Sequence, residues 1–275
     1  MVNTGPAKHR SVRALSRGLA LIGELNASGP STAQQLARKT GLNRTTCYRL
    51  LETLQQEGFV AFDQVTALFG LTTRVRTLSQ GVSTRDLSSQ AALPPMFTLL
   101  RDVSWPSDFG VFELGSVVIR ESTHEFSPFS IHRSMVGRRR SLVRSALGHA
   151  ILTAASPALR REMLEITASF VPEDAALASN RNFIVHVISQ TRKDGYASSI
   201  GGTEQGISGI ALPIQGIGPV LGSLNIVFFS SAMTPAVAAK RYLRAMRRTV
   251  REIERRWHGV HEKRKNAVAI TNGRS

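Results

Sequence analysis

The residues best suited to chemistry form a short polar run at the start of a predicted helix. Amide, hydroxyl and guanidinium groups in that position are the donors that reach base edges and phosphates in the major groove of DNA. The run lies in "TGLNRTTCYRLLETLQQEGFV", residues 40–60. Its candidate DNA-binding residues are Asn43, Arg44, Thr45, Thr46, Tyr48 and Arg49. The competing interpretation is a solvated helix face, with Tyr48 packed on a neighbouring helix.

Apolar spacing predicts the elements that must position this run. Its own helix carries core positions at Cys47, Leu50, Leu51 and Leu54, which makes the cysteine a core residue and not a nucleophile. An amphipathic helix is predicted over residues 11–27, with apolar positions at Val12, Leu15, Leu19, Ile22 and Leu25.

A short second helix and a hairpin complete the unit. Ser31 followed by Gln34 predicts a capping box, and Gly41 predicts the end of that helix. Residues 59–62 and 68–71 flank a polar turn and predict two strands. Together these elements predict a winged helix-turn-helix domain over residues 1–72, in which Ser31 and Thr32 are further DNA-binding candidates.

Charge points to a polyanionic partner at both ends of the chain. The formal net charge is +16, which a fold does not need for its own stability. Residues 1–80 carry 10 basic and 4 acidic side chains, residues 81–239 carry 13 and 12, and residues 240–275 carry 12 and 3. The central part is therefore nearly neutral and is expected to serve another purpose.

The remaining chain predicts a linker and a sensor domain. Residues 73–102 read as a linker helix that Pro94-Pro95 must kink or divide. Residues 103–260 read as a mixed α/β domain, whose strand candidates include "FSIHRSM" (residues 129–135) and which ends in a helix opened by Thr234-Pro235. Residues 261–275 are predicted to be a disordered basic tail.

Several classes of function lack the residues they need. Cys47 is the one cysteine, and the sequence opens without a signal-peptide pattern, so a reduced, cytoplasmic setting is expected. The apolar stretch 207–229 is broken by proline, glycine and polar residues, so no membrane partner is expected. His124, His132 and His149 match no metal-binding spacing. Without a nucleophile elbow or phosphate loop, no catalytic residue, metal or cofactor is assigned.

A second basic run, "GRRRSLVR" (residues 137–144), allows two interpretations. Gly137 would form a turn, and some of the arginines at 138, 139, 140 and 144 would be exposed or would contact another subunit. A simple solvated cluster is an equal alternative.

Three stretches of the chain resemble the IclR-type bacterial transcriptional regulators. They are "VRALSRGLALIGEL", "STAQQLARKTGLNRTTCYRLLETLQQEGFV" and "RKDGYASSIGGTEQGISGIALPI". The resemblance implies an α+β fold: an N-terminal winged helix-turn-helix, a linker helix and a C-terminal GAF-like α/β effector domain with an antiparallel sheet. It also implies homodimers or homotetramers, a pseudo-palindromic double-stranded DNA operator and no enzymatic activity. RNA polymerase is an open candidate for a further partner.

The resemblance also locates an effector pocket. Matched by motif, the residues that it implies are Gly137, Ser145, Ala146, Leu147, Glu204, Ile210, Asn225 and Val227. The last two depart from the serines common in the family, and the apolar Val227 favours an aromatic effector. Arg133 is the candidate partner for an effector carboxylate, although a surface salt bridge would explain it equally well. Met135, with Phe126 and Phe129, could provide apolar walls or core packing.

These expectations combine into one functional hypothesis with alternatives. "VSWPSD", "RESTHEFSPFSIHRSMVGRRRSLV" and "VFFSSAMT" resemble the branch of the family that activates hydroxyphenylpropionate catabolism. We therefore expect an activator of an aromatic-acid catabolic operon. The alternatives are a repressor that responds to a non-aromatic small organic acid, a catalytic α/β domain fused to a DNA-binding module, and a nonspecific architectural DNA binder.

Overall fold

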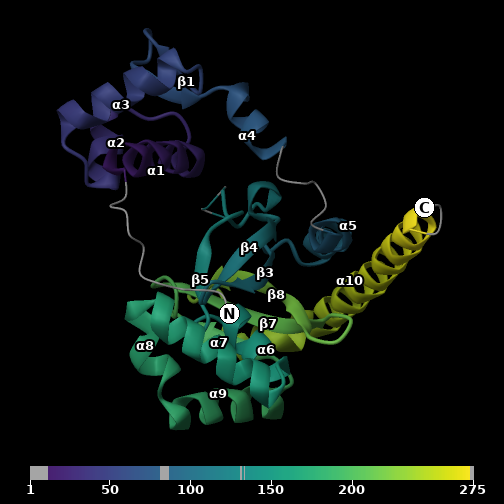
Figure 1. Cartoon of the computed structure of the whole chain (residues 1–275). Coiled ribbons are helices and arrows are strands. Elements are labelled where there is room, and N and C mark those ends of the chain that lie inside the picture. The colour runs from purple at the N-terminus through teal and green to yellow at the C-terminus, as the bar shows by residue number, and fades with distance from the viewer. Residues whose placement is uncertain (1–11, 81–86, 131, 133, 273–275) are drawn as a thin grey trace. The chain divides into compact units, whose positions relative to one another are not determined.

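The computed structural model describes residues 12–80, 87–130, 132 and 134–272 of the 275-residue chain (Figure 1). The chain divides into two compact units, Met1–Thr84 and Arg85–Ser275. The described elements of the first unit are α1 (Arg13–Ser28), α2 (Ala33–Thr40), α3 (Arg44–Gln56), β1 (Val60–Asp63), β2 (Leu68–Leu71), η1 (Thr73–Arg76) and α4 (Thr77–Gln80).

The first unit is a winged helix-turn-helix, as predicted. Helices α1, α2 and α3 enclose a small core with Leu21, Leu36 and Leu51 at its centre. Strands β1 and β2 pair antiparallel as the wing. One detail differs from the predicted pattern. Val12, Leu15 and Leu19 are more than half exposed, and the buried face of α1 consists of Leu25, which was predicted, and Leu21, which was not.

The second unit contains one six-stranded antiparallel sheet in its described part, in the order β5-β4-β3-β8-β7-β6. The strands are β3 (Asp108–Glu113), β4 (Ser116–Ser122), β5 (Arg139–Ser141), β6 (Ala197–Ile200), β7 (Ile207–Gln215) and β8 (Val220–Phe229). The helices are α5 (Leu87–Val103), η2 (His124–Phe126), α6 (Ala146–Ala154), α7 (Pro157–Phe170), α8 (Pro172–Ala178), α9 (Arg181–Asp194) and α10 (Pro235–Asn272).

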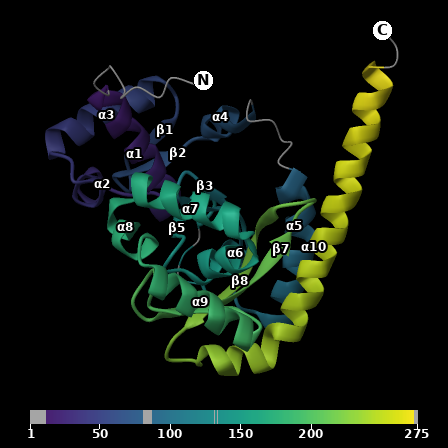
Figure 2. The same cartoon turned by 60° about the horizontal axis from the view of Figure 1, so that its bottom comes forward.

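Helices cover both faces of this sheet (Figure 2). Alternation along β7 explains the two layers, since successive side chains of a strand point to opposite faces. Ile210, Leu212 and Ile214 pack in one core with α5 and α10. Ala211 packs in the other core with α6, α7, α8 and α9. Gly209 and Ala211 are small, so they leave space between the sheet and the start of α6.

Three predictions about the helices and strands need correction or restriction. Pro94 and Pro95 lie inside α5 without dividing it, because buried Ala91 and Ala92 before the prolines and buried Met96 and Leu99 after them hold the helix on either side of the lost backbone donors. The segment 129–135 forms no strand in its described residues. Residues 81–86 lie outside the described residues, so a continuous linker helix over 73–102 stays a prediction.

The predicted disordered tail also differs from the structure, in which α10 continues to Asn272. Residues 261–272, "HEKRKNAVAITN", contain no glycine or proline and include several strong helix formers, so nothing in the sequence ends the helix there. None of the described helices is long and apolar enough to cross a membrane.

Candidate functional site

The start of α3 presents the polar run to solvent. The Asn43 side chain caps the helix, with its Oδ1 accepting the backbone N–H of Thr45 at 2.8 Å. Arg44, Thr45 and Arg49 are exposed. Cys47 lies on the opposite side, fully buried. The helix therefore holds its donors outward because its apolar side is fixed in the core, which is the arrangement that a DNA-reading helix needs.

Tyr48 and Thr46 occupy intermediate positions. The rings of Tyr48 and Phe69, the latter on the wing, pack edge-on with their centroids 6.3 Å apart. Even so, 39% of Tyr48 stays exposed. The Arg44 guanidinium lies 5.8 Å from the centre of the Tyr48 ring. Thr46 is half-buried, and with Arg49 it lines a groove between α1 and α3. Tyr48 therefore packs on the wing and not on a neighbouring helix, and its contact with DNA stays a prediction.

The two candidates at the start of α2 differ from the prediction. The capping residue is Thr32, whose hydroxyl accepts the N–H of Gln35 at 3.2 Å while the Gln35 side chain accepts the N–H of Thr32. Ser31 is buried, and its backbone exchanges two hydrogen bonds with Phe69 of β2. Ser31 is thus a structural residue, because the wing pairs with the chain at this point and covers it.

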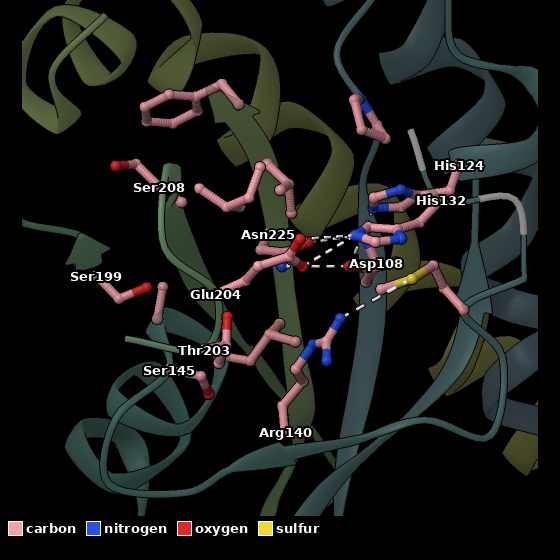
Figure 3. Close-up of a pocket in the computed structure, with 18 of the residues that line it drawn as sticks. Asp108, His124, His132, Arg140, Ser145, Ser199, Thr203, Glu204, Ser208 and Asn225 are labelled. Carbon is pink, nitrogen blue, oxygen red and sulfur yellow. Dashed lines mark hydrogen bonds and ion pairs between the residues drawn. The ribbon is translucent and has the colours of Figure 1, made fainter. Parts of the chain in front are cut away.

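The second unit holds a cavity between the sheet and the start of α6 (Figure 3). It is narrow, with a volume of about 50 Å³. The lining residues are Pro106, Asp108, His124, Phe129, Ser130, His132, Met135, Arg140, Ser145, Ala146, Leu147, Ser199, Thr203, Glu204, Ile207, Ser208, Gly209, Asn225, Val227, Phe228 and Phe229. We call this space the effector cavity.

A buried carboxylate, Asp108, lies in the wall of the effector cavity. It accepts a hydrogen bond from Ser122 at 2.8 Å, and its Oδ2 lies 3.6 Å from Nε2 of His124. Burial acts to raise the pKa of Asp108, but His124, Ser122 and the charge of Arg140 outweigh it and hold the pKa below its ordinary value. The cavity therefore contains a carboxylate that is ionised at neutral pH.

Arg140 supplies the cavity with a positive charge. Its side chain extends from β5 into the space (Figure 3) and lies 3.9 Å from the Met135 sulfur. Burial lowers the pKa of Arg140, and the negative charges of Asp108 and Glu204 oppose that shift. A guanidinium with donors facing a cavity can bind a carboxylate through two hydrogen bonds.

Two other arginines of the run at residues 137–144, Arg139 and Arg144, have structural partners. Arg139 donates to the backbone carbonyls of Glu113 and Leu114. Arg144 donates to the buried Asp174 at 2.8 Å, which joins the start of α6 to α8. The run is thus not a uniform solvated cluster, because Arg139, Arg140 and Arg144 have different surroundings.

Histidines add groups that can both donate and accept hydrogen bonds. His132 and Glu204 meet at 2.9 Å between segments distant in sequence. Nδ1 of His124 lies 2.6 Å from the Ser130 hydroxyl. Among the described residues, no group of three His, Cys, Asp or Glu side chains is placed to hold a metal ion.

Most predicted effector residues meet in the cavity. Those that line it are Met135, Ser145, Ala146, Leu147, Glu204, Asn225 and Val227. Ser145 also caps α6, because its Oγ accepts the N–H of Gly148 at 3.0 Å. Ile210 is fully buried in the core on the other face of the sheet, and Gly137 forms a turn outside the cavity. Arg133 lies outside the described residues.

The sequence did not identify Asp108, His124, His132 and Arg140 as residues that line the cavity. The histidines matched no metal spacing, and Arg140 was one of several arginines in a single run. A usable signal did exist in the sequence. Asp108 opens the predicted strand "DFGVFEL", and a carboxylate at the start of an apolar strand is a candidate buried polar group that needs a partner.

Family models match most of the chain. The IclR helix-turn-helix domain matches residues 14–64. The bacterial transcriptional regulator IclR C-terminal domain matches residues 80–255, which is more than half of the chain.

Known proteins resemble the chain in sequence and fold. The glycerol operon regulatory protein of Streptomyces coelicolor is 30% identical over 211 residues, covering 75% of this chain and 80% of that protein. The Thermotoga maritima IclR structure has a TM-score of 0.64 at 17% identity, covering 90% of this chain and 99% of that one. An IclR homolog from Microbacterium hydrocarbonoxydans, complexed with 4-hydroxybenzoate, has a TM-score of 0.59 at 21% identity, with the same coverage. The chain therefore belongs to the IclR family of transcriptional regulators, which are not enzymes.

Proposed function

We propose that the chain regulates an aromatic-acid catabolic operon, with a hydroxylated aromatic carboxylate as its effector and activation as its effect. The observation that carries this proposal is Arg140, a largely desolvated guanidinium that faces the effector cavity. Burying a charge is unfavourable without a partner. Asp108 and Glu204 balance the positive charge of Arg140 only in part, and an anionic ligand would supply the remaining partner.

The cavity offers both ends of such a ligand suitable contacts. Its carboxylate would take the two-pronged contact with Arg140. Its ring would lie against Phe129, Met135 and Val227, which are apolar lining residues. A ring hydroxyl could donate to the ionised Asp108. A ring needs more space than the present cavity gives, and the flexible Met135 side chain is the group best able to move.

Regulation would follow from coupling this cavity to α3. In a homodimer or homotetramer, two symmetric copies of α3 would read a pseudo-palindromic operator with half-sites about one helical turn apart. Effector binding would favour one arrangement of the DNA-binding units over another. Asn43, Arg44, Thr45, Thr46, Tyr48 and Arg49 are the proposed DNA contacts, with RNA polymerase as a further candidate partner for an activator.

Comparison with known proteins supports the aromatic class only in part. The Microbacterium homolog binds 4-hydroxybenzoate, whereas the Streptomyces relative is named for a glycerol operon. The second candidate is therefore a repressor that responds to a non-aromatic small organic acid. The narrow cavity and its hydroxyl groups at Ser199, Thr203 and Ser208 favour this candidate.

A thermal-shift screen separates the two candidates, since a ligand that binds only the folded state raises its melting temperature. The panel contains hydroxylated phenylpropionates, cinnamates and benzoates, with glycolate, pyruvate and glycerol as the non-aromatic set. We expect a concentration-dependent shift from at least one aromatic acid. Shifts confined to the non-aromatic set would support the second candidate instead.

Paired variants then test the role of Arg140. Arg140→Met should abolish the shift caused by the active acid, while the full-length protein keeps its affinity for DNA. Arg139→Met is the matched control, because Arg139 lies on the same strand and bonds to carbonyls outside the effector cavity. Equal responses in wild type and Arg140→Met would contradict the proposed carboxylate contact.

A further inference from the structure

We propose that an exposed arginine stripe on α10 is a second DNA-binding surface, which holds the phosphate backbone of double-stranded DNA apart from the contacts of α3. The stripe consists of Arg241, Arg244, Arg248, Arg251 and Arg255. Neither of the two candidate effectors enters this inference, and it stands whichever of them is correct.

The spacing places these arginines on one face of the helix. Positions separated alternately by three and four residues lie one above another. All five side chains are exposed. The opposite face, with Met246, Val250 and Ile253, packs into the core with α5 and the sheet. The stripe spans about 21 Å at the rise of an α-helix, which is long enough to contact several phosphates.

Acidic partners neutralise only part of the stripe. Arg248 pairs with Asp102 of α5. Arg255 pairs with Glu252 at 2.7 Å, and the same carboxylate also accepts from Arg256 at 2.8 Å. Glu254 is engaged elsewhere, because it accepts the backbone N–H of Gln215.

Three arginines retain an unmatched charge. In the described part of the chain, no acidic side chain lies within 4.0 Å of Arg241, Arg244 or Arg251. Packing of α10 does not need them, since they lie on the face away from the core. Three unpaired cations on one helix face therefore form a site for a multivalent anion.

Helix α10 continues beyond the residues that the C-terminal family model matches, and its sequence there is also basic. The C-terminal family model ends at residue 255, whereas α10 runs to Asn272. Its sequence adds Lys263, Arg264 and Lys265. Both views show this second half of α10 extending past the sheet (Figures 1 and 2).

The chemistry of the stripe favours duplex DNA over other polyanions. Single-stranded nucleic acid is bound with the help of aromatic stacking platforms, and the stripe contains only arginines. An amphipathic helix that enters a membrane surface needs an exposed apolar face, but the apolar residues of α10 opposite the stripe, Met246, Val250 and Ile253, are buried. Duplex DNA presents a dense row of phosphates and is already the partner of this family's first domain.

The test compares two triple variants of the full-length protein. The stripe variant is Arg241→Gln, Arg244→Gln and Arg251→Gln. The control variant removes three exposed cations elsewhere on the same unit: Arg161→Gln, Arg181→Gln and Lys193→Gln. Binding to a random-sequence duplex of about 40 base pairs is measured by fluorescence anisotropy from about 50 to 200 mM KCl.

Each lost phosphate contact should lower the slope of log affinity against log salt by about 0.9. We expect the stripe variant to lose about 2 to 3 units of slope and the control variant less than about 0.5. The loss should persist in an Arg44→Ala, Arg49→Ala background, which separates it from contacts of α3. An unchanged slope, or equal losses in both triples, would overturn the proposal. So would loss of binding to phosphatidylserine vesicles without any change on DNA.

Discussion

Asn225 holds Asp108 in place across two neighbouring strands. The Oδ1 of Asn225 accepts the backbone N–H of Asp108 at 2.7 Å, and its Nδ2 lies 3.4 Å from the Asp108 carboxylate. Both residues are buried in the wall of the effector cavity. Asn225 therefore orients the carboxylate as well as lining the cavity.

Replacing this amide should destabilise the second unit. Asn225→Leu keeps the approximate size of the side chain but leaves the Asp108 N–H without its partner. A buried donor left unpaired costs about 1 to 3 kcal/mol. The free energy of unfolding should therefore fall by that amount, and the midpoint of urea unfolding should move to a lower concentration. Val227→Ala, two residues along the same strand, is the control for loss of a partly exposed side chain. Equal stability of Asn225→Leu and wild type would contradict this role.

Substitution of the exposed DNA-binding candidates should weaken operator binding, and substitution of the buried candidate should not. Arg44→Ala and Arg49→Ala should each weaken operator binding by about 1 to 3 kcal/mol if these side chains read bases. Ser31→Ala should keep wild-type affinity, because Ser31 is buried beneath the wing. Competition binding with an operator fragment measures all three. Wild-type affinity in both arginine variants would remove them from the interface.

The single thiol should be unreactive in the folded protein. Cys47 is fully buried with its Sγ directed at the Ala33 carbonyl, and burial raises the pKa of its thiol. Because the thiolate is the reactive form, Ellman's reagent at pH 7 should label the native protein far more slowly than the urea-unfolded chain. Labelling at the same rate in both states would show that Cys47 is accessible.

His149 should make stability depend on pH. Burial lowers the pKa of His149, opposed by contacts with the carbonyls of Val143 and Ser198. The unfolded chain then binds the proton first, so stability is complete above the unfolded pKa of about 6.5 and falls as the pH drops towards the folded pKa. The slope contributed is at most about 1.4 kcal/mol per pH unit.

Urea titrations between about pH 7.5 and 5 measure this dependence. His149→Gln should flatten the slope, whereas His186→Gln, on an exposed position of α9, should leave it unchanged. If both variants kept the wild-type slope, the proton would be taken up elsewhere.

Local patterns were sufficient to predict the first unit. The repeat of Cys47, Leu50, Leu51 and Leu54 fixed which side of α3 is buried, and the polar run therefore had to face outward. The start of α2 was misplaced by one residue, because Ser31 and Thr32 are both good caps. The wing decides between them, since β2 takes the backbone of Ser31 and leaves Thr32 to cap.

The effector cavity could be predicted only in part. Motif resemblance named Ser145, Leu147, Glu204 and Val227, which line the cavity, but it does not record the direction of each side chain. Ile210 lies next to Gly209 in sequence and on the opposite face of the sheet, since adjacent residues of a strand point apart.

Sequence alone determined the helices and hairpin of the first unit and the positions of excess charge, because periodicity, caps and composition are local properties. The tertiary structure decided which charged groups share a space. Asp108, His132, Arg140 and Glu204 come from separate segments, and only the assembly of the six-stranded sheet brings them around one cavity. Burial and mutual charge then set their ionisation, and neither quantity exists until the chain has folded.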